Sequence, residues 1–281
     1  MKTIIVHHSA DFDGICSKLI VSRAFPKADT LGFNYGDPIP ELKDYDQIIM
    51  VDISFPPDIM LGLKGRLTWV DHHITAIQDS ERNGYSSIPG IRKVGEGACE
   101  LAWKYFMKSS VPQAVKYLSA YDVFDKSRFP WLDVVVPFQY ALRGKFGLNL
   151  VDEVIEMDPS DLIGEGKSIL NFLKLDWKES VNKNAFPITI DGKYKGICMI
   201  TTQKGSLQFD SVYPEYDLFV WGSFDKSGIF RFSLASNGER VPEFNCGLYL
   251  KNHYNGGGHQ GIGGGTLGIE QFMGLVQQKV L

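Results

Sequence analysis

The sequence has few cysteines and no long apolar run. Four cysteines stand far apart in 281 residues without a CxxC pair, so we expect free buried thiols in a reducing compartment rather than disulfides or a zinc site. They are Cys16, Cys99, Cys198 and Cys246. No apolar stretch reaches the ~20 residues that cross a bilayer, and the first six residues are too short for the core of a signal peptide. These absences predict a cytoplasmic protein with no membrane partner.

An excess of positive charge is also missing. The chain has 29 Lys and Arg against 33 Asp and Glu, which gives a net charge of −4. Proteins that hold long nucleic acids through phosphate contacts are usually basic, so long double-stranded nucleic acid is not an expected partner. A small phosphorylated substrate stays compatible with this charge, because bound cations reverse the local field.

The pattern of the first half predicts an α/β domain. Short apolar runs at 3–6, 47–51 and 67–70 alternate with amphipathic stretches, of which 13–24 is the first. Continuous apolar runs separated by helices are typical of parallel strands buried on both faces. Ligands of such sheets bind beyond the carboxyl ends of the strands, and each of these runs ends at a histidine or an aspartate.

The second half predicts a connector and a smaller α+β domain. The length of 281 residues favours two domains. A long, mostly polar helix is expected at 159–185, and short strand-like runs separated by turns follow from Pro187. These runs lie at 188–190, 197–200, 218–220 and 229–234, with helices at 245–254 and 269–280. The predicted divisions are a catalytic domain at 1–155, a helical linker at 156–186 and a C-terminal substrate-binding domain at 187–281.

Histidines and aspartates gather at two of the predicted strand ends. His7 and His8 precede Asp11 and Asp13 at the end of the first strand. Imidazole and carboxylate are ligands that suit manganese, iron and zinc. The alternative for either aspartate alone is that it caps the following helix.

A second cluster of the same kind follows the third strand. Asp71, His72 and His73 are consecutive there, and Asp52 ends the second strand. Asp52 is the natural carboxylate to lie between two ions, and two cations can clamp a phosphate and activate water. A mononuclear site with spare acids is the alternative. Asp122 stands in an apolar context and is a further candidate ligand, although a capping or surface role fits it alone.

A glycine run marks the C-terminal domain. Seven glycines occupy ten positions from 256 to 265, and His259 stands among them. Glycine allows the backbone to approach a ligand and direct several N–H groups at an anion. His259 adds a side chain for a phosphate oxygen or a leaving group. The alternative is a flexible turn.

Taken together, these motifs resemble the DHH phosphoesterase superfamily. The resemblance runs in order along nearly the whole chain, from His7-x-x-x-Asp11-x-Asp13 through Asp52, Asp71-His72-His73 and Asp122 to Gly256-Gly257-Gly258-His259. Members include RecJ-type exonucleases, oligoribonucleases, cyclic dinucleotide phosphodiesterases, exopolyphosphatases and pyrophosphatases. The resemblance implies a parallel-sheet N-terminal domain, a smaller C-terminal domain, an active site in the cleft between them, and two divalent ions, usually Mn²⁺, with Mg²⁺ or Co²⁺ possible.

The resemblance also implies a role for each matching residue. One ion would be held by His7, Asp11 and Asp52. The other would be held by Asp13, Asp52, His72 and Asp122. Asp71, His73 and His259 would be the catalytic residues, with Asp71 supporting the site from behind. The substrate phosphate would face His73, and its far end would bind Gly256, Gly257, Gly258 and His259.

The chain departs from the family pattern at two places. His8 rather than His7 is an alternative ligand, although the four-residue spacing to Asp11 favours His7. Many nucleotide-cleaving relatives carry Ser-Leu-Arg-Ser in a late strand, whereas this chain has Ala235 in place of the arginine. Arg231 and Arg240 are candidates to replace it.

The function expected from the sequence is a Mn²⁺-dependent phosphodiesterase. Its substrates would be short oligonucleotides or small, including cyclic, dinucleotides, cleaved by attack of a metal-activated hydroxide on phosphorus. One alternative is an exopolyphosphatase or pyrophosphatase, although dedicated pyrophosphatases of the superfamily lack the Gly-Gly-Gly-His ending. A further alternative is a nucleotide-binding module without catalysis.

Overall fold

The chain divides into two units between Leu170 and Asn171, inside the long helix α8 (Ser160–Asn184). The structure is a computed structural model and describes residues 1–203 and 205–277. The expected boundaries at 155 and 187 stay a prediction, as does their assignment to catalysis and substrate binding. No helix in the described part of the chain is long and apolar enough to span a membrane.

A four-stranded parallel sheet forms the centre of the first unit. Its strands are β1 (Thr3–His8), β2 (Asp29–Phe33), β3 (Gln47–Val51) and β4 (Leu67–Val70). Their order is β2-β1-β3-β4, and every neighbouring pair runs parallel. This sheet confirms the predicted α/β class. The edge strand β2 was not expected, because most of its residues are exposed and polar or small.

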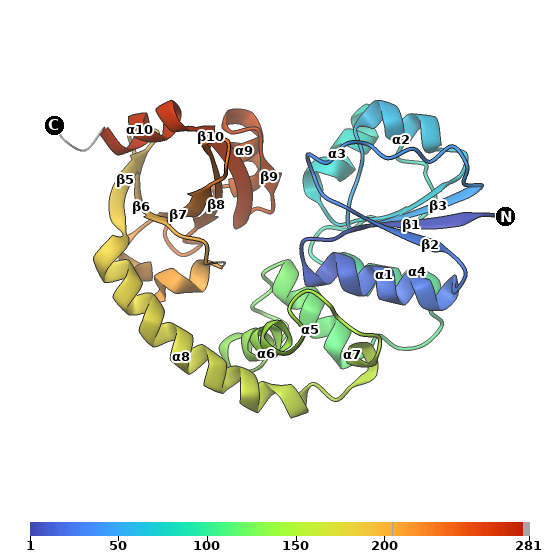
Figure 1. Cartoon of the computed structure of the whole chain (residues 1–281), viewed down its shortest axis with the longest axis horizontal. Helices are drawn as coiled ribbons and strands as arrows, with labels where there is room; N and C mark the ends of the chain where they lie inside the picture. The colour runs from blue at the N-terminus through green and yellow to red at the C-terminus, as the bar shows by residue number, and fades with distance from the viewer. Residues whose placement is uncertain (204, 278–281) are drawn as a thin grey trace. The chain divides into compact units, whose positions relative to one another are not determined.

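Helices cover both faces of this sheet (Figure 1). Ile5, Val51 and Val70 pack toward α1 (Phe12–Ala24) and α4 (Ala98–Phe106). The alternate side chains of the same strands pack on the other face, toward α2 (Pro57–Leu63) and α3 (Ile74–Arg82). Burial on both faces explains why the strand sequences are continuously apolar.

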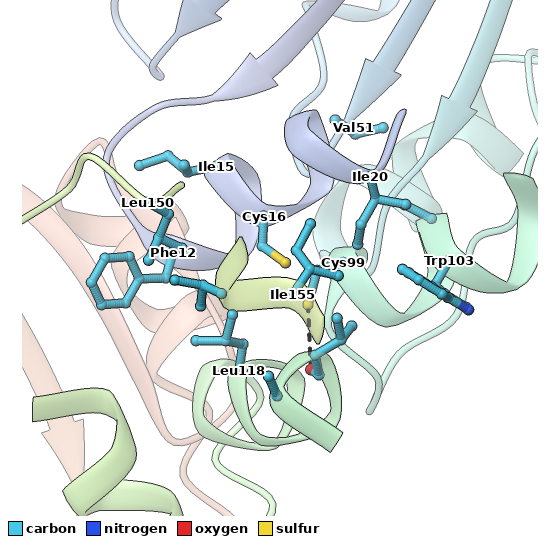
Figure 2. Close-up of a cluster of buried hydrophobic side chains, with 14 of the residues drawn as sticks. Phe12, Ile15, Cys16, Ile20, Val51, Cys99, Trp103, Leu118, Leu150 and Ile155 are labelled. Atoms are coloured by element: carbon cyan, nitrogen blue, oxygen red, sulfur yellow. Dashed lines mark hydrogen bonds between the residues drawn. The ribbon is translucent and has the colours of Figure 1, made fainter. Parts of the chain in front are cut away.

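The core between the sheet and helices α1 and α4 packs the start of α1 against α4 (Figure 2). Ile15, Cys16 and Ile20 of α1 pack in one cluster with Cys99 of α4 and Leu118. Cys99 Sγ donates a hydrogen bond to the carbonyl oxygen of Val115, 3.7 Å away. All four cysteines are free and buried, as expected.

The remaining helices of this unit follow the sheet. They are α5 (Gln113–Asp122), the π-helical turn Trp131–Val135, α6 (Val136–Phe146) and α7 (Glu153–Glu156). The sequence pattern also predicts helices at 97–107, 112–121 and 132–142. They correspond to α4, α5 and the segment from the π-helical turn into α6.

The second unit contains a mixed six-stranded sheet. Its strands are β5 (Phe186–Ile190), β6 (Tyr194–Ile200), β7 (Leu218–Phe224), β8 (Ile229–Ser236), β9 (Gly257–Gly258) and β10 (Ile262–Gly268). Their order is β5-β6-β7-β8-β10-β9, and in the described part of this sheet β6 and β7 pair in parallel while the other neighbouring strands pair antiparallel.

Three further helices belong to this unit. They are the 3-10 helix at Ser206–Glu215, α9 (Cys246–His253) and α10 (Ile269–Gln277). Val220, Phe230, Leu250 and Phe272 are central members of the core that joins α9 and α10 to the sheet. The last predicted helix, 269–280, extends past the described residues at its end.

Candidate metal centre

The carboxyl edge of the parallel sheet carries the predicted histidines and aspartates. Strands β2 and β3 lie on opposite sides of β1. The connection from β1 to β2 and the connection from β3 to β4 therefore run in opposite directions across the sheet, and ligands of such sheets bind at this point. His8 ends β1, Asp52 follows β3, and Asp71 follows β4. The sheet therefore collects residues more than 60 positions apart at one edge.

The first cluster joins His8, Asp11 and Asp52. Nδ1 of His8 lies 3.0 Å from Oδ2 of Asp11 and 3.6 Å from Oδ2 of Asp52. Asp11 also caps helix α1, because its Oδ1 accepts a hydrogen bond from the backbone N–H of Gly14 at 3.0 Å. Capping and site formation, which are alternatives from the sequence alone, are thus compatible in one side chain.

The second cluster surrounds His72. Nε2 of His72 lies 3.0 Å from Asp52 Oδ1, 3.3 Å from Asp122 Oδ2 and 3.5 Å from Asp13 Oδ2. Asp13 comes from the first turn of α1 and Asp122 is the last residue of α5. Asp52 contributes to both clusters, which is the position predicted for a shared carboxylate.

The backbone at Asp52 takes an uncommon conformation. Its φ is +60°, in the left-handed region that most side chains avoid and that aspartate and asparagine enter more readily. The residue is 1% exposed and follows the buried strand β3 directly. The chain therefore turns sharply at the point where it presents this carboxylate to both clusters.

Asp71 holds the two histidines that follow it. Its Oδ1 accepts hydrogen bonds from the backbone N–H of His72 at 2.7 Å, from that of His73 at 3.1 Å, and from Nδ1 of His73 at 2.7 Å. Its Oδ2 accepts one from Trp69 Nε1 at 3.1 Å. Both oxygens are occupied in this way, so Asp71 orients the two histidines; its supporting role in a catalytic site stays a prediction.

The pKa shifts show how much negative charge is concentrated here. Burial and the charge of Asp52 raise the pKa of Asp13 to about 7. Burial, and then the charge of Asp13, raise the pKa of Asp122 well above its ordinary value. Burial raises the pKa of Asp52, but the hydrogen bonds from His72 and His8 and the charges of His72 and His73 together lower it more, so the net direction is downward.

The histidines compensate for part of this charge. Burial lowers the pKa of His8, but its hydrogen bonds to Asp11 and Asp52 and the charges of these two carboxylates together raise the pKa to about 11. Burial also lowers the pKa of His72, but the hydrogen bond to Asp52 and the charges of Asp122, Asp52 and Asp13 together raise it well above its ordinary value. Buried carboxylates that need positive charge, with imidazoles beside them, are a donor set that fits divalent cations.

The structure groups His8, not His7, with the aspartates. Nδ1 of His7 donates a hydrogen bond to the carbonyl oxygen of His8 at 2.8 Å. Successive residues of a strand point to opposite faces, so the neighbouring histidines cannot both point the same way. The assignment of His7 as a ligand stays a prediction, and the grouping in the structure favours His8 for the same position.

The start of helix α4 holds Asp13 and was not identified from the sequence. The backbone N–H groups of Ala98 and Cys99 donate to the two carboxylate oxygens of Asp13 at 2.6 and 2.9 Å. A Cβ at Gly97 would lie 2.9 Å from Oδ1 of Asp13 and 2.8 Å from Cα of Ser119. Gly97 is therefore the residue that lets this helix N-terminus approach the carboxylate, and a glycine opening a predicted helix was the available signal.

The glycine run belongs to the second unit and forms a tight hairpin. Strands β9 and β10 pair Gly258 with Gly263 and Gly257 with Gly264. A Cβ at Gly258 would lie 2.5 Å from Cα of Gly263, whereas a Cβ at Gly257 would meet no atom within 4 Å. The run is thus partly required by backbone packing, and Gly257 is a position that leaves room for a ligand. The backbone N–H of His259 donates to the carbonyl oxygen of Ile262 at 2.8 Å.

The two arginines considered as replacements for the family arginine have acidic partners. Arg231 Nε donates to Asp225 at 2.9 Å, and Arg240 Nε donates to Asp217 at 2.7 Å. Ala235 itself is 5% exposed on strand β8.

Comparisons with known proteins identify the fold. No protein-family model and no curated protein matches the sequence. The structure is similar to a pGpG-specific phosphodiesterase, PggH from Vibrio cholerae, with 13% identity over 99% of this chain and 97% of that chain and a TM-score of 0.52. It is also similar to the DHH domain of a protein described as a member of a family of ribosomal proteins, with 12% identity over 100% of this chain and 86% of that chain and a TM-score of 0.60. The chain has the DHH phosphoesterase fold.

Proposed function

We propose that this protein is a two-metal phosphodiesterase that cleaves short oligonucleotides or dinucleotides. The observation that carries the proposal is the pair of His–Asp clusters that share Asp52 at the carboxyl edge of the sheet. A pGpG-specific phosphodiesterase of the same fold supports a dinucleotide as the substrate. Mn²⁺ is the proposed ion, with Mg²⁺ and Co²⁺ as the others to test.

The ligand assignment follows the two clusters. His8, Asp11 and Asp52 would hold one ion, with His7 as the alternative histidine. The residues around His72 would hold the other; they are Asp13, Asp52, His72 and Asp122. Two bound cations would supply positive charge for the phosphate oxygens and a nucleophile at neutral pH.

The remaining residues would position the substrate. Because Nδ1 of His73 donates a hydrogen bond to Oδ1 of Asp71, Nε2 is the ring atom that would face a phosphate oxygen or the leaving oxygen. Trp69 and the backbone of the His72–His73 turn hold Asp71 in place, so His73 keeps this orientation. We assign Gly256, Gly257, Gly258 and His259 to the far phosphate or nucleotide, since Gly257 leaves its backbone open.

A substrate panel on metal-free protein tests this proposal. The protein is titrated with Mn²⁺, Mg²⁺ or Co²⁺ and given pGpG, longer oligonucleotides, cyclic dinucleotides, pyrophosphate and polyphosphate. We expect metal-dependent release of mononucleotides, fastest from the shortest linear substrates. Faster phosphate release from pyrophosphate or polyphosphate would instead identify a phosphoanhydride hydrolase, and binding of nucleotide without hydrolysis of any substrate would identify a non-catalytic module.

A further inference from the structure

An exposed tyrosine stands beside the metal centre and has no part in the ligand assignment. Tyr35 lies two residues after strand β2, and the residue is 57% exposed. Its ring centroid lies 6.3 Å from that of His8 and 6.1 Å from that of His73. The ring therefore lies next to one residue of the first cluster and to the histidine proposed to face the substrate.

The turn that carries Tyr35 is fixed to the end of strand β1. Oδ1 of Asn34 accepts hydrogen bonds from the backbone N–H and the hydroxyl of Ser9 at 3.3 and 3.2 Å. Asp37 closes the turn, because its carboxylate accepts from the Asn34 N–H at 2.8 Å and its own N–H donates to the Asn34 carbonyl at 3.0 Å. Gly36 supplies the positive φ of +97° that this turn requires.

Ser9 directly follows His8, so these hydrogen bonds hold the aromatic ring at a set place relative to a candidate ligand. The Tyr35 hydroxyl lies 3.4 Å from Oγ of Ser54, two residues after Asp52. The ring is thus tied at both ends to segments that carry the site, while much of its surface stays in contact with solvent.

We propose that Tyr35 stacks on the nucleobase attached to the phosphate at the metal centre, and so makes the site selective for nucleotides over base-free phosphates. The inference rests on the proposed function. Aromatic side chains bind bases of any sequence by stacking, because every base has a π-face. A base is separated from its phosphate by one ribose, a span that suits a ring placed 6.1 Å from the ring of His73.

A role for the tyrosine hydroxyl fits the geometry less well. The Tyr35 hydroxyl lies 3.4 Å from Oγ of Ser54, so it already has a partner within the protein, whereas the residue as a whole is 57% exposed. Substitution by phenylalanine separates the two roles, since it keeps the ring and removes the hydroxyl.

The first experiment compares Tyr35→Leu and Tyr35→Phe on pGpG and on an abasic dinucleotide, with saturating Mn²⁺. For Tyr35→Leu we expect KM for pGpG to rise about 5- to 100-fold, the range that loss of one stacked base implies. KM for the abasic dinucleotide should not change, and Tyr35→Phe should behave as the wild type on both. Tyr105→Leu is the matched control, because Tyr105 is 41% exposed on helix α4 and lies outside both clusters.

The second experiment measures binding without turnover. Calorimetric titration of the Mn²⁺-loaded protein with GMP and with ribose 5-phosphate compares the same phosphate with and without a base. Tyr35→Leu should weaken GMP binding and leave ribose 5-phosphate binding unchanged. Equal weakening of both ligands, unchanged GMP binding, or a defect in Tyr35→Phe as large as in Tyr35→Leu would overturn the stacking role. A wild type that binds GMP and hydrolyses no dinucleotide would contradict the proposed function alone.

Discussion

Asp52 is the residue on which both clusters depend. Its carboxylate oxygens lie 3.0 Å from Nε2 of His72 and 3.6 Å from Nδ1 of His8. Asp52→Asn should fold, because asparagine also tolerates the left-handed backbone found here. Loss of the shared charged ligand should reduce bound Mn²⁺ from two ions to one or none and lower kcat/KM more than about 100-fold. Elemental analysis and steady-state kinetics on the same preparation measure both effects.

Asp44→Asn is the matched control for this charge change, because Asp44 is an exposed aspartate before strand β3. It should retain two ions and full activity. Two ions bound with unchanged affinity in Asp52→Asn would remove the basis for a shared carboxylate.

The choice between the neighbouring histidines leads to a second prediction for single residues. His8→Ala should lose more bound Mn²⁺ than His7→Ala. Nδ1 of His8 lies 3.0 Å from Oδ2 of Asp11, whereas Nδ1 of His7 donates a hydrogen bond to a backbone carbonyl oxygen. Metal content after dialysis against the same free Mn²⁺ concentration measures the difference. The reverse order would restore His7 to the ligand position that the family spacing predicts.

At the scale of single elements, two glycines of the hairpin β9–β10 are expected to have different roles, one in packing and one in substrate binding. Gly258 has a φ of +141°, and its added Cβ would lie 2.5 Å from Gly263. Gly258→Ala should therefore lower the free energy of unfolding by about 1–3 kcal/mol. Gly257→Ala should leave stability nearly unchanged, because its Cβ meets open space, and should raise KM if this backbone approaches the substrate. Thermal unfolding and KM are measured for both variants.

The two glycine variants serve as controls for each other. Equal destabilisation by both would mean that the run is required throughout for packing. An unchanged KM in Gly257→Ala would argue against contact between this backbone and the substrate.

Elements with a strong apolar pattern were predictable, and those that depend on packing were not. The buried runs at 47–51 and 67–70 match β3 and β4, because a strand covered on both faces has a continuous apolar sequence. Strand β2 is an exposed edge with no such pattern, and β10 contains four glycines that gave no strand signal. Those two strands form through pairing with neighbours that are distant in the sequence.

The candidate site shows the same division. Ligand-type residues at or just after predicted strand ends gave Asp11, Asp13, Asp52, Asp71, His72 and His73. Asp122, at the end of helix α5, was identified by its apolar context and by its place in the order of the family motifs. Gly97 and Tyr35 were not, because their roles depend on which segments meet in space, and neither residue type indicates a ligand by itself. Which of His7 and His8 points toward the aspartates depends on the path of the chain at the end of β1. The four-residue spacing from His7 to Asp11 does not determine that path.

At the scale of the whole molecule, metal binding should stabilise one unit. The residues proposed to hold the two ions lie inside the unit that ends at Leu170; they are His8, Asp11, Asp13, Asp52, His72 and Asp122. A cation at 100 times its dissociation constant adds about 2.7 kcal/mol to the stability of the state that binds it. Hydrogen exchange of the full-length protein with and without Mn²⁺ should therefore slow at the carboxyl ends of β1, β3 and β4 and at the start of α4.

The second unit provides the internal control in the same measurement. Strands β5 to β8 pair with one another and surround their own core, which includes Val220 and Phe230. Their exchange rates should be the same with and without Mn²⁺, because stabilisation by a ligand reaches only the segments that open together with its site. Slowing in β5 to β8 equal to that in β1 and β3 would show that the two units open as one. No slowing at β1, β3 and β4 would mean that Mn²⁺ does not bind the Asp52 clusters.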